Sequence, residues 1–194
     1  MPGILSWCLG GVLAGLATNL IVFAAALPPW VTWAAVFLVI PAANLLRIQS
    51  MLQFEGRSLP WYGWVLALLL ATGFGWAAGT DYALLGFGFH ILLYLAVGSA
   101  SCWVGQRSGN GSAYWIGGFF FLIAGLMVAH KLSIPSEGAP EIFQSSVWAI
   151  ALVAVAACGA LATYIGYTGL VLEQVSKQRV AAEADARSRA ATVR

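Results

Sequence analysis

Charged side chains are scarce in this sequence. Asp, Glu, Lys and Arg together make up 8% of its 194 residues, whereas hydrophobic residues make up 61%. An ordinary soluble domain carries about 25% charged residues, so a chain this poor in charge cannot cover a globule with polar surface. We therefore expect its solvent to be the lipid bilayer. The net charge is only +2, and no basic stripe alternates with aromatic residues, which argues against a nucleic-acid partner.

Motifs that would carry catalysis or hold a cofactor are also missing. The three cysteines, Cys8, Cys102 and Cys158, lie in apolar runs and share no short spacing, so neither a disulfide framework nor a zinc site is expected. The sequence contains no G-x-S-x-G, H-E-x-x-H, phosphate-loop or C-x-x-C motif. His90 and His130 are expected at different depths, which argues against a pair of haem ligands. We expect no enzyme activity, no cofactor and no metal.

Long apolar runs are what the sequence does contain. A helix needs about 20 mainly apolar residues to cross the hydrocarbon of a bilayer. Six segments meet this requirement, over about residues 4–27, 30–46, 61–79, 82–104, 114–129 and 147–172. The sequence therefore predicts an all-α, polytopic membrane protein with one six-helix transmembrane domain, residues 1–172. The charged residues 173–194 are rich in alanine, which predicts a cytoplasmic tail that continues the last helix.

The basic residues predict the orientation of these spans, because Lys and Arg accumulate in cytoplasmic loops. With six spans and a cytoplasmic N-terminus, eight basic residues fall inside and Lys131 alone falls outside. The eight are Arg47, Arg57, Arg107, Lys177, Arg179, Arg187, Arg189 and Arg194. We therefore expect a multi-pass protein of the plasma (inner) membrane with both termini in the cytoplasm.

Polar residues inside the predicted spans are the candidates for a functional site, because they are costly in lipid. Asn19, Asn44, His90 and Tyr164 are the residues that we expect to contact a solute in a path through the bundle. The other interpretation of the two asparagines is an interhelical hydrogen bond, worth about 1 kcal/mol or less. No Asp, Glu, Lys or Arg lies in the middle of a predicted span, which argues against a pump with a buried carboxylate.

Several short motifs lie where a family of small permeases carries related ones. Pro2-Gly3 opens the first span and Asn19 lies near its end; Gln53-Phe54-Glu55-Gly56 follows the second span; Ala162-Thr163-Tyr164, with Glu173 beyond it, lies in the sixth. With these features the chain resembles the acetate–succinate transporter family of proton-coupled carboxylate permeases. The resemblance implies six spans and the transport of a short carboxylate.

The chain also departs from that family's pattern. Its opening Asn-Pro-Ala is absent, Gln53 replaces an acid, and Pro41-Ala42-Ala43 replaces a glycine pair. An asparagine late in the first helix is similar to the acid-gated urea and amide channels, a second six-span family of this size. We therefore expect a small-solute permease or channel for a short carboxylate such as acetate, or for a neutral amide, working as a homo-oligomer. The alternative is a non-transporting protein: an accessory subunit of a larger membrane partner, or a stress-response protein similar to the six-helix acid-resistance proteins.

Overall fold

The computed structural model describes residues 3–23, 26–78, 83–133 and 147–192, and these residues form helices and short connections with no strand. The helices are α1 (Ile4–Val22), α2 (Pro29–Ala34), η2 (Ala35–Val39), α3 (Ile40–Phe54), α4 (Trp61–Ala78), α5 (Ala83–Ser108), α6 (Gly111–Ser133) and α7 (Val147–Thr192). The prediction of an all-α chain is confirmed for this part of the sequence.

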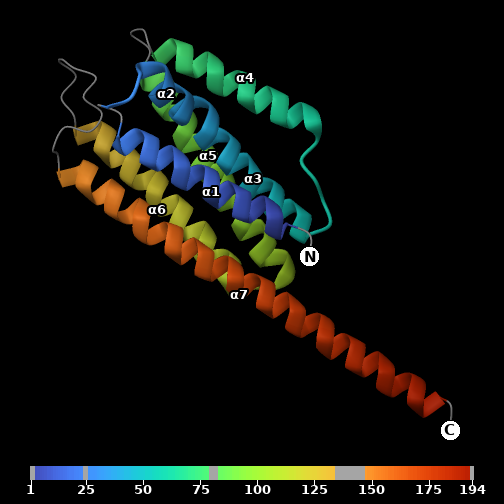
Figure 1. Cartoon of the computed structure of the whole chain (residues 1–194). Helices are drawn as coiled ribbons and strands as arrows, with labels where there is room; N and C mark the ends of the chain where they lie inside the picture. The colour runs from blue at the N-terminus through green and yellow to red at the C-terminus, as the bar shows by residue number, and fades with distance from the viewer. Residues whose placement is uncertain (1–2, 24–25, 79–82, 134–146, 193–194) are drawn as a thin grey trace.

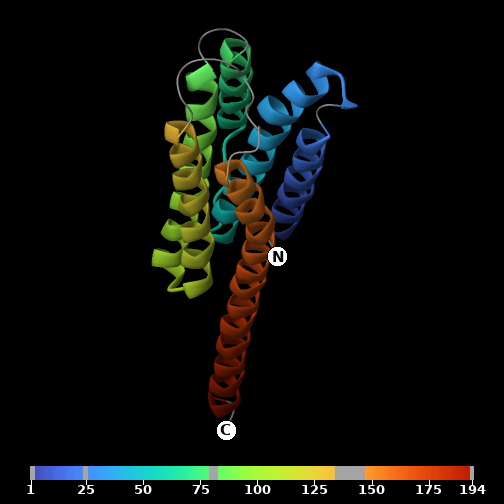
Figure 2. The same cartoon turned by 90° about the vertical axis from the view of Figure 1, so that its left-hand side faces the viewer.

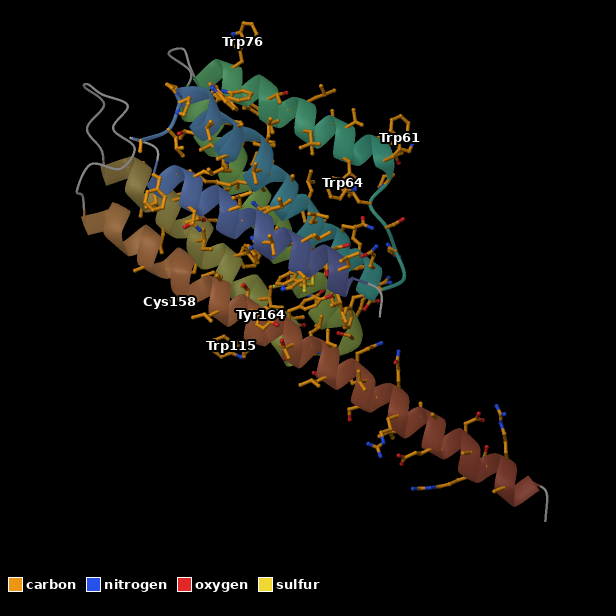
Figure 3. The ribbon with its side chains drawn as sticks, in the orientation of Figure 1. Trp61, Trp64, Trp76, Trp115, Cys158 and Tyr164 are labelled. Atoms are coloured by element: carbon orange, nitrogen blue, oxygen red, sulfur yellow. The ribbon has the colours of Figure 1, made fainter. Side chains whose placement is uncertain are left out.

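Four of the described helical segments are long and apolar enough to cross a membrane. They are Ile4–Val22, Pro29–Phe54, Gly88–Ser108 and Gly111–Ala129, and Pro29–Phe54 joins α2, η2 and α3 into one segment. The apolar stretch of α4, Trp61–Trp76, is shorter. Large apolar side chains also point outward: Trp61, Trp76 and Trp115 are 76–80% exposed (Figure 3). Exposed apolar surface of this extent suits lipid rather than water, so the chain has the character of a membrane protein; six spans remain a prediction.

The helices form one bundle from which α7 projects (Figure 1). α1 packs on α3, α3 on α5, α5 on α6, and α6 on α7, while α4 lies at the edge against α5 and η2. The second view shows α7 running far beyond the other helices toward the C-terminus (Figure 2). We call the end of the bundle where α1 begins, α3 and α5 end and α7 leaves the tail end.

Two left-handed glycines end helices at the tail end. Gly56 (φ 69°) follows α3, and the N–H groups of Gly56 and Arg57 return to the carbonyls of Gln53 and Leu52. This pattern is a Schellman motif, in which glycine adopts the left-handed conformation without a Cβ penalty. Gly109 (φ 64°) ends α5 in the same backbone region. The two turns place the segments that follow them at the same end of the bundle.

The largest buried cluster lies toward the tail end, where five helices meet. It contains Trp7, Met51, Val97, Val104, Ala113, Ile116, Phe120, Tyr167 and Leu170. Trp7 of α1 and Tyr167 of α7 stack with ring centroids 4.5 Å apart and planes 5° from parallel. α5 and α6 approach closely at Gly98 and Gly117, where a Cβ on either glycine would meet the carbonyl oxygen of the other. The helices α1, α3, α5, α6 and α7 thus pack around one core.

The structure moves one charged residue from a loop into a helix. The expected second span ended at residue 46, with Arg47 in the loop beyond it, but α3 continues to Phe54. Arg47 therefore lies within the apolar segment Pro29–Phe54, seven residues from its end, and the prediction that Arg47 lies in a loop is wrong. The polar residues after Arg47 lower the hydropathy of the sequence, but Ser50 and Gln53 are hydrogen-bonded to other helices of the bundle. Hydropathy alone does not register such pairing.

Candidate functional site

Four polar residues of α3 recur at every third position: Asn44, Arg47, Ser50 and Gln53. Three residues fall about 60° short of a full helical turn, so successive members of this row face different neighbours. Asn44 and Arg47 face α5 and α6, Ser50 faces α7, and Gln53 faces α1. The row thus winds around α3 from the interior of the bundle to its tail end.

Asn44, Arg47 and Tyr94 form a polar group inside the bundle, which we call the arginine cluster. Arg47 Nη1 donates a hydrogen bond to Asn44 Oδ1 at 3.2 Å. Tyr94 of α5 lies near both Asn44 and the guanidinium. Asn44 is 1% exposed. The guanidinium carbon lies 5.4 Å from the centroid of the Phe120 ring on α6. Arg47 is half-buried, and its guanidinium lies among residues of three helices, α3, α5 and α6.

α1 covers this cluster closely. A Cβ on Gly10 would lie 2.8 Å from the Ala43 carbonyl oxygen and 3.2 Å from Arg47 Cγ. Glycine at this position therefore allows the backbone of α1 to lie directly on the stem of Arg47. Arg47 is seven residues from the end of α3, which is roughly 10 Å along the helix axis at 1.5 Å per residue. The cation is neither at the helix end nor in the aqueous tail.

The charge of Arg47 has no carboxylate counterpart in the described residues. The four ion pairs found there all lie along α7, between residues 173 and 189. A guanidinium presents five N–H donors and stays protonated in proteins. Among the described residues, Asn44 Oδ1 accepts a hydrogen bond from it. A cation inside a membrane bundle is costly, so Arg47 is a candidate functional residue.

A second polar layer lies between the arginine cluster and the tail end of the bundle. The Ser50 hydroxyl donates to the Tyr167 hydroxyl oxygen at 2.9 Å, which joins α3 to α7. The Ser6 hydroxyl donates to Gln53 Oε1 at 3.0 Å, which joins α1 to α3. The stacked ring of Trp7 lies on Tyr167 beside them.

The four residues predicted to contact a solute do not lie together in the bundle. Asn44 belongs to the arginine cluster. Asn19 is exposed on α1, and its Nδ2 donates to the Gly15 carbonyl of the same helix. Tyr164 is 62% exposed on the outer side of α7 (Figure 3). Tyr94 is not among the site residues predicted from the sequence, and the predicted topology places Arg47 in a loop. The spacing of Asn44 and Arg47 on one continuous helix is the signal that the sequence offers.

His90 is buried near the other end of the bundle, beside the π-helical turn η2. Its Nε2 lies 2.9 Å from the Val36 carbonyl oxygen, and because a carbonyl only accepts, Nε2 is the donor. In the π-helical turn the Ile40 N–H bonds to the Ala35 carbonyl. The next residue is Pro41, which has no N–H. The backbone N–H groups at positions 40 and 41 are therefore not available to the Val36 carbonyl, and His90 donates the hydrogen bond instead.

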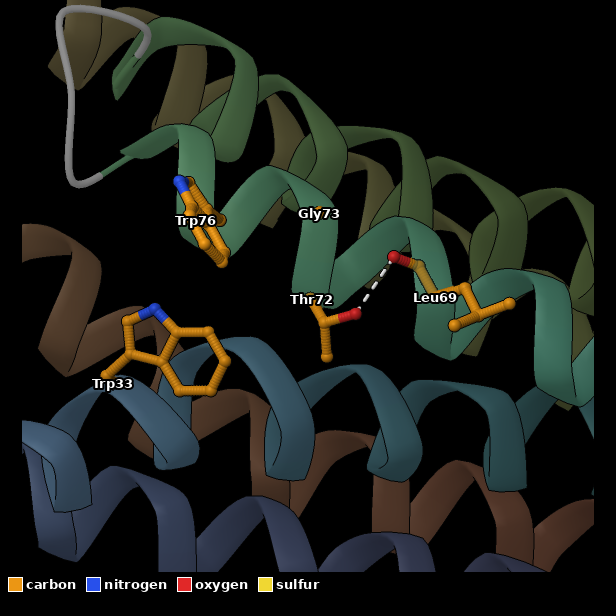
Figure 4. A pocket seen from close by; sticks show the side chains of 5 residues that line it. All are labelled: Trp33, Leu69, Thr72, Gly73 and Trp76. Atoms are coloured by element: carbon orange, nitrogen blue, oxygen red, sulfur yellow. Dashed lines mark hydrogen bonds between the residues drawn. The ribbon is translucent and has the colours of Figure 1, made fainter.

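A groove between α4 and α2 lies away from these polar groups. It has a volume of about 420 Å³ and is lined by Trp33, Leu69, Thr72, Gly73 and Trp76 (Figure 4). The Thr72 hydroxyl donates to the Leu69 carbonyl of its own helix at 2.9 Å. The groove is open and mainly apolar, so it suits a hydrocarbon chain better than a charged solute.

No group of three or more His, Cys, Asp or Glu side chains that could hold a metal ion occurs in the described ranges. Comparison with protein-family models, with curated proteins and with solved structures found no match for this chain. The resemblance to the acetate–succinate transporter family therefore stays a prediction.

Proposed function

We propose that this chain is a small-solute permease for a short carboxylate such as acetate, and that the arginine cluster binds the carboxylate inside the bundle. The observation that carries the proposal is the half-buried Arg47 guanidinium between α3, α5 and α6, which no carboxylate in the described residues neutralises. A neutral amide would leave that charge uncompensated. The proposal retains six spans in the plasma (inner) membrane with both termini cytoplasmic.

The chemistry of the cluster suits an anion of this size. A guanidinium matches a carboxylate with two parallel N–H···O bonds, and the Asn44 amide and Tyr94 hydroxyl offer further donors beside it. The Phe120 ring beneath the guanidinium keeps its plane oriented, as in other cation–π pairs. Because a permease has to release its solute, binding should be weak.

Uptake of radiolabelled acetate into proteoliposomes tests the proposal with Arg47→Gln. Hydrogen bonds to charged groups contribute about 1.5–3 kcal/mol, which corresponds to roughly 10- to 150-fold in affinity. At acetate concentrations below saturation we expect flux to fall at least tenfold, and Arg47→Lys to retain part of it. Arg179→Gln is the matched control, because it removes one positive charge from the exposed tail. Wild-type flux in a folded Arg47→Gln protein would refute the proposal that Arg47 binds the carboxylate.

The homo-oligomer remains part of the proposal, because Asn19 and Tyr164 face outward and could contact a solute only at an interface between copies. Asn19→Leu with unchanged flux would remove that residue from the path.

One observation favours the non-transporting alternative. Residues 175–190 of α7 form an exposed, charged helical stretch beyond the bundle, a shape suited to docking on a larger membrane partner. Absence of acetate or amide flux in wild-type protein, together with a stoichiometric co-purifying membrane subunit, would favour this function over the permease.

A further inference from the structure

Two arginines share one indole at the tail end of the bundle. The guanidinium carbon of Arg57, in the α3–α4 connection, lies 5.2 Å from the Trp103 ring centroid, and that of Arg107, in the last turn of α5, lies 4.8 Å from it. Trp103 is half-buried, and both arginines are exposed. This group is separate from Arg47, which lies deeper along α3.

The backbone around Arg57 is fixed rather than free. Arg57 follows Gly56 in the Schellman motif, and its own N–H bonds to the Leu52 carbonyl at 2.9 Å. Two residues on, the Leu59 N–H donates to Gln49 Oε1 at 2.6 Å. These bonds hold the connection against the end of α3. Arg57 is therefore presented to Trp103 by a defined turn, and Arg107 by a helix.

No carboxylate of the described residues lies within ion-pairing distance of either arginine; the ion pairs found there lie along α7. Nearby Lys177 is already engaged, with Glu173 and with the Ser108 carbonyl. A cation–π contact contributes about 0.5–1 kcal/mol at an exposed site, but two like charges near one ring also repel each other. Favourable placement at the C-terminal ends of α3 and α5 explains each arginine alone. It does not explain why both meet at Trp103.

We infer that Arg57, Trp103 and Arg107 bind the phosphate of an anionic phospholipid headgroup. Arginine binds phosphate oxygens with paired N–H donors, and two guanidiniums around one phosphate would relieve their mutual repulsion. Tryptophan at the end of an apolar helix is typical of the headgroup level of a bilayer, so a lipid phosphate reaches this site more readily than a free one. The site does not depend on what the protein transports.

Thermal unfolding of the full chain in a neutral detergent tests this inference. A ligand that binds only the folded protein raises the melting temperature with its concentration. We titrate phosphatidylglycerol, phosphatidylcholine and inorganic phosphate separately. Phosphatidylglycerol should raise the Tm of the wild type in a saturable way, and the other two should not. An equal shift from inorganic phosphate would overturn the lipid assignment, and an equal shift from phosphatidylcholine would overturn recognition of a net anion.

Matched variants then locate the site. In Arg57→Gln/Arg107→Gln, the phosphatidylglycerol concentration for half-maximal stabilisation should rise at least fivefold. The control, Arg187→Gln/Arg189→Gln, removes the same charge from the tail and should leave that phosphatidylglycerol concentration unchanged. Trp103→Leu keeps both charges and should raise the concentration for half-maximal stabilisation at least twofold. If the double variant does not fold, Arg57→Lys and Arg107→Lys take its place, with at least a twofold rise expected in each. Equal responses of the site and control variants would overturn the site.

Discussion

Replacing His90 by leucine removes the N–H group that donates a hydrogen bond to the Val36 carbonyl. This bond replaces the one that Pro41, which has no N–H, cannot make. An unsatisfied buried acceptor costs about 1–3 kcal/mol. The substitution also removes edge contacts of the imidazole with Phe37 and Phe89, whose ring centroids lie 5.6 and 6.1 Å away. A single variant therefore mixes two effects. A double-mutant cycle with Pro41→Ala separates them, because the aromatic contacts are lost in both backgrounds.

In the Pro41→Ala background, the new N–H at position 41 lies five residues after Val36 and can close a π-type bond to its carbonyl. His90→Leu should then cost about 1 kcal/mol less than in the wild type, which is roughly the net value of one hydrogen bond. For a chain of 150–250 residues, 1 kcal/mol corresponds to about 2–4 °C in Tm.

Thermal unfolding of the four proteins in one detergent measures this coupling. His90→Gln keeps an N–H donor at the same number of bonds from the backbone, but on a flexible side chain without the ring, and should recover part of the loss. An identical fall in Tm after His90→Leu in both backgrounds would refute the view that His90 replaces the proline's missing donor. The histidine would then be a packing residue only.

Three further predictions concern packing and topology. Tyr167→Phe keeps the stacked ring and removes the partner of Ser50, so it should cost about 0.5–1.5 kcal/mol in unfolding experiments; no change would show that this bond is dispensable. Gly117→Ala places a methyl 2.9 Å from the Gly98 carbonyl oxygen and should cost about 1–3 kcal/mol, whereas Gly118→Ala has open space and should be neutral or stabilising; equal effects would contradict the close α5–α6 approach. Ser188→Cys in a cysteine-free chain should react with an impermeant maleimide in inside-out vesicles and not in intact cells, and the reverse result would invert the topology.

The helical membrane character of this protein follows from its sequence alone. With 8% charged residues and apolar runs of about 20 residues, the chain satisfies its backbone hydrogen bonds in lipid by forming helices. The turn at Gly56 and the helix start at Pro29 are also local, because the backbone preferences of glycine and proline act within a few residues.

Only the tertiary structure decided which polar residues face the interior. Where a helix is apolar on every side, as α1 is, periodicity does not distinguish the side facing lipid from the side facing the bundle, and Asn19 proved to be exposed. Hydropathy likewise ended the second span at residue 46, because Arg47, Ser50 and Gln53 count as polar wherever they lie. Their partners, Phe120, Tyr167 and Ser6, come from three other helices. The packing of those helices holds Arg47 inside the bundle, and no local stretch of sequence records it.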